Sequence, residues 1–162
     1  MKKRIIALSL CLLLTGCGAA QTFETVDDLY AEPVVQRQVE VKLPKEAAQS
    51  AMSGTAGSIY LCDGYTITVQ TFPSGTLDDA VRSVSGFTAQ ALAPIQTQQG
   101  DTDCYHCVWT AAGEGGDQVG RAVILDDGQC RYAVSVMAPA QTAGDLAETW
   151  QTVLSSVKLS TD

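Results

Sequence analysis

The chain has 162 residues and a formal net charge of −8, from 18 acidic and 10 basic residues. This length fits one domain and a short tether. Without residues 1–16, which hold Lys2, Lys3 and Arg4, 7 basic residues face 18 acidic ones and the charge is −11. Such a surface repels the phosphate backbone of nucleic acids, so neither DNA nor RNA is expected as a partner.

The N-terminal segment has the layout of an export signal. A basic cluster at residues 1–4 precedes an apolar run at 5–14, which is shorter than the roughly 20 residues that a membrane-spanning helix needs. The run ends in Leu14-Thr15-Gly16-Cys17, which resembles the bacterial lipobox. This resemblance implies cleavage before Cys17 and attachment of a diacylglyceryl group, with acyl chains such as palmitate, to its thiol. An ordinary signal peptide cut after Ala20 is the alternative, and the agreement of charge, apolar run and motif favours the lipoprotein.

These features predict three parts: a lipoprotein signal peptide at residues 1–16, a lipidated N-terminus and tether at 17–37, and a folded domain at 38–162. We expect the exported chain to be anchored in the bilayer through acylated Cys17, on the extracytoplasmic face. Each buried methylene of an acyl chain contributes about 0.8 kcal/mol to anchoring. An acidic protein surface repels anionic headgroups, so the lipid is the expected anchor.

The first half of the domain predicts a strand, a hairpin and a helix. Residues 38–43 alternate apolar and polar side chains, which is typical of a half-buried strand, and residues 45–57 suggest a loop or a weak helix. Strands at 59–61 and 65–72 flank Asp63-Gly64, a pair that favours a tight hairpin turn. Thr76 can then cap a helix that ends at Gly86. Residues 89–93 suggest a further short helix before a proline.

The second half predicts a three-stranded meander at residues 103–111, 119–126 and 130–137. Its middle strand is apolar on both faces, so both faces of the sheet should be covered. A final helix at 142–157 has one apolar stripe, formed by Leu146, Trp150, Val153, Leu154 and Val157. The order of elements predicts the α+β class, with an antiparallel sheet of about six strands covered by helices.

This layout resembles the PsbP-like fold, a group that includes an extrinsic photosystem subunit and many bacterial lipoproteins. The resemblance covers roughly residues 39–159 and rests on Val-Lys-Leu-Pro at 41–44, the segment 65–80, Tyr-Ala-Val-Ser-Val at 132–136 and the closing segment 150–159. It implies an accessory, assembly or binding role. The group shares no catalytic motif, so no functional residue is carried over from it.

Four cysteines fall in the domain, and they are candidate core residues, disulfide partners or thiols: Cys62, Cys104, Cys107 and Cys130. Cys104-Tyr105-His106-Cys107 also holds the single histidine, so zinc binding or thiol-redox chemistry is a candidate function. The following residues favour a strand, which would place Cys104 and His106 on one face and Cys107 on the other. In a regular meander Cys130 lies too far from this segment to bond, so any disulfide should involve Cys62.

The remaining motifs favour structural roles. The aspartates at 101–103 and 126–127 are read as turn formers rather than calcium ligands, the glycines at 113–116 as a hairpin loop, and both tryptophans as core. No serine lies in a Gly-x-Ser-x-Gly motif. We therefore expect a non-enzymatic binding or accessory module without a cofactor, whose partner is an unidentified protein or small molecule. The alternative is a thiol-redox or zinc protein that uses Cys104, His106 and Cys107.

Overall fold

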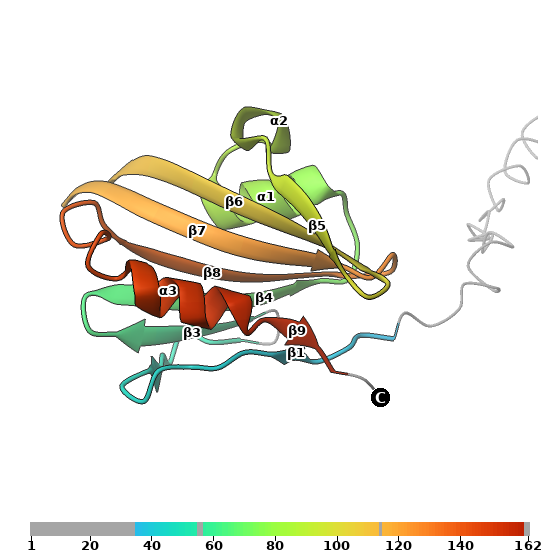
Figure 1. Cartoon of the computed structure of the whole chain (residues 1–162), viewed down its shortest axis with the longest axis horizontal. Coiled ribbons are helices and arrows are strands. Elements are labelled where there is room, and N and C mark those ends of the chain that lie inside the picture. Colours follow the sequence, from blue (N-terminus) through green and yellow to red (C-terminus); the bar gives the residue numbers. More distant parts are fainter. Residues whose placement is uncertain (1–34, 55–56, 114, 161–162) are drawn as a thin grey trace, which may run out of the picture. The chain divides into compact units, whose positions relative to one another are not determined.

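The computed structural model describes residues 35–54, 57–113 and 115–160, which form an α+β domain (Figure 1). The predicted signal peptide, Cys17 and residues 17–34 of the predicted tether lie outside the described residues. Within the described part, no helix has the length and apolar character needed to cross a membrane.

Seven strands form one antiparallel sheet, and three helices pack beside it. The order of the strands is β2 (Ala48–Gln49), β3 (Gly57–Cys62), β4 (Tyr65–Phe72), β8 (Arg131–Pro139), β7 (Gly116–Asp126), β6 (Thr102–Gly113) and β5 (Ile95–Gln99). Two further strands, β1 (Val39–Glu40) and β9 (Lys158–Leu159), pair with each other outside this sheet. The helices are α1 (Leu77–Ser85), α2 (Ala89–Leu92) and α3 (Ala147–Ser155).

The predicted fold class is confirmed, and the details differ at the edges. The sheet has one strand more than expected, because two unpredicted strands lie at its edges while the predicted strand at 38–43 lies outside it. β2 falls in the segment predicted as a loop or a weak helix, and β5 has every residue exposed, so no apolar alternation marks it in the sequence. Of the strand predicted at 38–43, only two residues form a ladder, and they pair with β9. The last helix begins later than expected, because the chain first makes turns in which Thr142 and Ala143 donate to Pro139 O.

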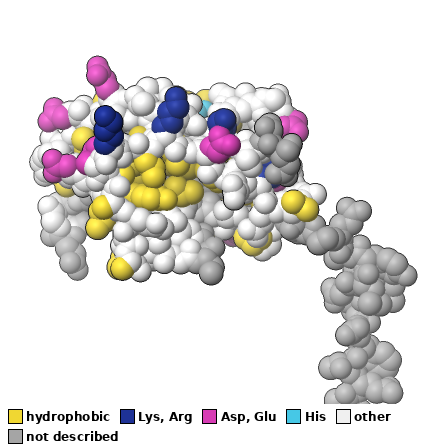
Figure 2. Space-filling model, turned by 90° about the horizontal axis from the view of Figure 1, so that it is seen from below, with side chains coloured by type: hydrophobic (Ala, Val, Ile, Leu, Met, Phe, Trp, Pro, Cys, Tyr) yellow, Lys and Arg dark blue, Asp and Glu magenta, His cyan; other side chains and the backbone are white. Residues whose placement is uncertain are grey.

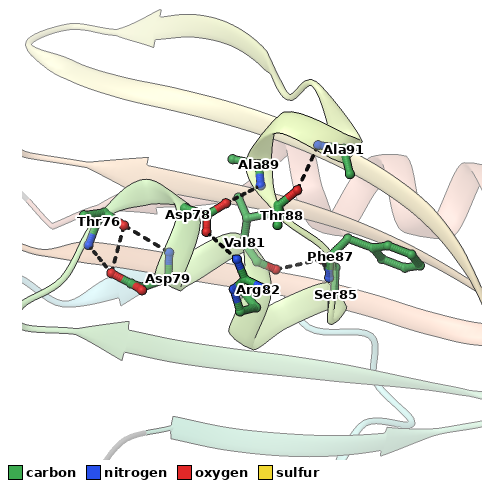
Figure 3. Close-up of polar contacts among 10 residues, drawn as sticks. All are labelled: Thr76, Asp78, Asp79, Val81, Arg82, Ser85, Phe87, Thr88, Ala89 and Ala91. Carbon is green, nitrogen blue, oxygen red and sulfur yellow. Dashed lines mark hydrogen bonds and ion pairs between the residues drawn. The ribbon is translucent and has the colours of Figure 1, made fainter.

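Local sequence signals account for the hairpin and for α1. Gly64 takes a φ of 78° in the turn between β3 and β4, a conformation that glycine adopts without strain. The Thr76 hydroxyl accepts a hydrogen bond from Asp79 N, while the Asp79 carboxylate accepts one from Thr76 N (Figure 3). This capping box satisfies two N–H groups that the first turn of a helix leaves unpaired.

Asp78 joins α1 to α2. Its carboxylate accepts from Ala89 N at 2.6 Å and from the Arg82 guanidinium at 2.8 Å (Figure 3). These two interactions, the backbone one first, lower the pKa of Asp78. The exposed Arg82–Asp78 pair itself adds little stability, because water screens it.

The sheet has a hydrophobic core on each face, and the central strand β7 contributes to both. Val123 and Leu125 pack under α3, while Ala122 and Ile124 pack under α1, and all four are buried. Side chains alternate between the faces of a strand, so an apolar run of this kind requires cover on both sides. The expectation that helices cover both faces is therefore what the structure shows.

A hydrogen-bond network around buried Tyr132 holds both ends of the domain together. Its hydroxyl donates to Asp127 Oδ2 at 3.0 Å and accepts from Arg37 N at 2.9 Å. Arg37 in turn donates through Nη2 to Ser160 O at 2.9 Å. The network thus links the start of the described chain, its end, and the turn between β7 and β8.

Candidate functional site

The Cys104–Cys107 segment lies on β6, and the structure separates its predicted site residues. Cys104, 0% exposed, packs in the core under α3, whereas Cys107, 3% exposed, packs under α1. His106 is exposed, with Nε2 at 3.5 Å from Cys104 Sγ and 3.2 Å from Thr97 Oγ1. Cys104 and His106 are therefore neighbours, and Cys107 lies on the opposite face of the sheet.

The environment of these thiols keeps them protonated. Burial raises the pKa of Cys107 to about 11, and it raises that of Cys104 against an opposing hydrogen bond with Thr97. Burial also raises the pKa of half-buried Cys62. Because the thiolate is the nucleophile and the metal ligand, such cysteines react slowly at neutral pH. All four domain cysteines, Cys130 included, are unpaired thiols.

The acidic residues of the turn between β7 and β8 accept backbone hydrogen bonds. Asp127 Oδ1 accepts from Gln129 N and Cys130 N, at 3.0 and 2.7 Å. Burial alone would raise the pKa of Asp127, but these bonds and the Tyr132 hydroxyl lower it. Among residues 35–54, 57–113 and 115–160, no three His, Cys, Asp or Glu side chains come close enough to hold a metal ion.

A pocket of about 210 Å³ adjoins His106, between β6, β7 and α3. It is lined by polar and apolar residues, namely His106, Cys107, Val108, Arg121, Ala122, Gln151, Leu154 and Ser155. None of these lining residues is acidic, although the chain as a whole is. Val108 is 61% exposed, so an apolar wall of the pocket is open to solvent.

Arg121 is the charged group of this pocket. Its guanidinium carbon lies 5.9 Å from the centre of the buried Trp150 ring, which is cation–π distance. Its Nε is buried without a hydrogen-bond partner, as is Nε1 of Trp150. The ion pairs between described residues involve Arg82, Arg131 and Lys158, so Arg121 takes part in none of them. The pocket thus holds a positive charge without a counterion from the described chain.

Arg121 is not among the site residues predicted from the sequence. The residue stands in a strand that was read for its apolar character, and a single cation there looks like an interruption of the pattern. The available signal was chemical, because arginine inside an apolar central strand needs a partner or an aromatic face. The position of α3 over this face, which decides whether a pocket forms, could not be read from spacing along the strand.

A larger groove of about 490 Å³ runs between β1 and the strands β3 and β4. Figure 2 views the molecule from below Figure 1, where β1 and β3 lie, and shows a hydrophobic patch flanked by basic and acidic side chains. The basic residue that lines this groove is Arg37. Its Nε and Nη2 already donate to Ser160 O, so its main role is to close the domain.

No family model and no curated protein matches the chain. Solved structures do match. A Bacteroides thetaiotaomicron protein aligns over 76% of this chain at 14% identity and a TM-score of 0.52, and the chain spans about half of its length, 46%. LpqN, described as involved in cell envelope biogenesis of Mycobacterium tuberculosis, aligns over 82% of this chain and 88% of its own, at 11% identity and a TM-score of 0.51.

The Saccharomyces cerevisiae Ran-binding protein Mog1p aligns over 75% of this chain and 89% of its own, with 10% identity and a TM-score of 0.50. Identities this low show a shared fold and nothing about activity. The neighbours agree with the PsbP-like α+β fold expected from the sequence.

Proposed function

We propose that the chain is an exported lipoprotein whose domain is a non-enzymatic binding module, with the pocket beside Arg121 as its ligand site. The observation that carries the proposal is Arg121, whose buried Nε has no hydrogen-bond partner among the described residues, in a pocket lined by no acidic residue. A charge that burial strips of water is costly unless something pairs with it, and a ligand would supply that partner. The shielded, protonated thiols support a binding role over thiol chemistry.

The proposed export and lipid anchoring rest on the basic start, the short apolar run and Leu-Thr-Gly-Cys at residues 14–17. The similarity to LpqN, which is described as involved in cell envelope biogenesis, supports a location outside the cytoplasm. Under this proposal the acyl chains on Cys17 hold the domain at the membrane, and its acidic surface stays in solvent.

Metabolic labelling with radioactive palmitate tests the proposed lipid attachment at Cys17. The wild-type chain, expressed in a bacterium, should incorporate label and sediment with membranes, whereas Cys17→Ala should remain unlabelled. Cys11→Ala is the matched control, because this cysteine lies inside the predicted signal and should leave labelling unchanged. Label that persists in Cys17→Ala would refute the proposed attachment site.

Thiol accessibility separates the proposed module from the alternative thiol or zinc protein, whose structural support is the contact between Cys104 and His106. Alkylation of the native chain without reductant should modify Cys62 first and leave Cys104 and Cys107 slow, because both are buried. Native mass spectrometry should find no bound zinc. Rapid modification at Cys104 and Cys107, or a stoichiometric zinc adduct, would favour the alternative.

A further inference from the structure

We infer that the pocket between β6, β7 and α3 binds a small organic monocarboxylate, whose carboxylate pairs with Arg121 and whose apolar body lies against Val108 and Leu154. The inference deepens the proposed function by naming the class of ligand for the same site.

The charge of the pocket selects an anion. Arg121 is its only basic residue that is always protonated, and no acidic side chain lines it. A guanidinium presents its N–H donors as a planar fork that fits the two oxygens of a carboxylate. The chain carries a net charge of −8, so an anion is attracted to this place by a local field and not by the protein as a whole.

The number of cations argues for a single negative charge. One guanidinium balances a monoanion, whereas a phosphate group of charge near −2 would stay half uncompensated. Gln151 and Ser155 lie four residues apart on α3 and both line the pocket. The Gln151 amide can donate to the outer edge of a carboxylate, whereas the Ser155 hydroxyl already donates to Thr152 O at 3.3 Å. His106 stands on the facing strand.

The size and the apolar walls of the pocket determine which apolar body the ligand can carry beside its carboxylate. A cavity of about 150 Å³ accommodates benzene. A pocket of about 210 Å³ therefore has room for a benzene-sized body and one carboxylate. Val108 and Leu154 offer that body apolar contact, which a simple inorganic anion would not use.

Arg121 could instead serve only to cover the Trp150 ring. A purely structural arginine stabilises the fold through its stem and its cation–π contact, and it gives the pocket no preference between an acid and its amide. The comparison of these two compounds therefore distinguishes a binding role from a covering one.

The test uses benzoate and its uncharged isostere benzamide, titrated by calorimetry into the purified full chain at millimolar concentrations. Benzoate should bind at least about tenfold more tightly than benzamide, since hydrogen bonds to charged groups contribute that much or more. Arg121→Gln should weaken benzoate binding by a similar factor. Arg82→Gln is the matched control, because Arg82 lies on α1 outside the pocket, and it should bind normally.

Gln151→Glu tests the same site without disturbing the fold, because Gln151 is exposed on α3 and glutamate has nearly the same shape. The new carboxylate would compete for Arg121, so benzoate binding should fall at least about tenfold. Equal binding of benzoate and benzamide would keep the pocket as a ligand site and overturn the carboxylate assignment. Binding of neither compound would overturn the pocket as well, while labelling at Cys17 is judged by its own experiment.

Discussion

Gly120 offers the sharpest test of the packing on the α1 face of the sheet. It lies directly across from Trp109 in the ladder between β6 and β7. A Cβ added at Gly120 would stand 2.2 Å from two carbons of the Trp109 ring, where real contacts lie beyond 3 Å. The tryptophan covers the place of the missing side chain, so Gly120→Ala must push a buried ring out of its position.

We expect Gly120→Ala to destabilise the domain by about 1–3 kcal/mol, the usual cost of overpacking a core. The ring cannot swing freely, because it belongs to a closed cluster with Ala80, Val81 and Ile124. Urea denaturation would measure the loss as a lower midpoint with an unchanged slope. Native fluorescence should change as well, since Trp109 moves.

Gly144→Ala is the matched control, because a Cβ there meets nothing within 4 Å. Its stability should stay within about 0.5 kcal/mol of the wild type. A Gly120→Ala protein as stable as this control would refute the close packing of Trp109 on Gly120.

Three further predictions concern other parts of the fold. Tyr132→Phe removes a hydroxyl that donates to Asp127 and accepts from Arg37. Denaturation should show that the free energy of unfolding falls by about 1–2 kcal/mol. An unchanged free energy would mean that the network does not stabilise the domain. Thr76→Ala breaks the capping box and should cost about 1 kcal/mol, with Thr76→Ser as the control that restores it. The pKa of Cys107 is raised to about 11 in the folded state, so its contribution to stability is full below pH 9 and is lost as the pH rises toward 11. The melting temperature should therefore fall between pH 9 and 10, and Cys107→Ala, which would show a smaller fall, tests that this thiol contributes.

The sequence predicted the elements whose signals are local. Asp63-Gly64 marked the hairpin, Thr76 and Gly86 marked the two ends of α1, and the apolar run of β7 indicated cover on both faces. Each of these signals follows from the conformational preference of one or two residues, or from a short periodic pattern.

The features that depend on distant contacts were missed. β5 has no apolar alternation because it is exposed at the sheet edge, and pairing with β6 alone defines it. β1 is short because its partner is β9, more than a hundred residues further along the chain. The cysteine motif directed the prediction to β6, whereas the cation of the neighbouring pocket comes from β7 and its polar side chains from α3. A pocket assembled from three elements leaves no fixed spacing in the sequence.

The pairing of β1 with β9 has a mechanical consequence. The ladder joins Val39 with Leu159 and Glu40 with Lys158, and Arg37 adds its bonds to Ser160 O. Tension applied to the chain at Val35 would first load the bonds of Arg37, to Ser160 O and to the Tyr132 hydroxyl on β8, and then the ladder between β1 and β9. The first event under load would then be the release of β1, with the sheet still intact. Under load, β1 would therefore detach first, while the core and the pocket beside Arg121 keep their structure.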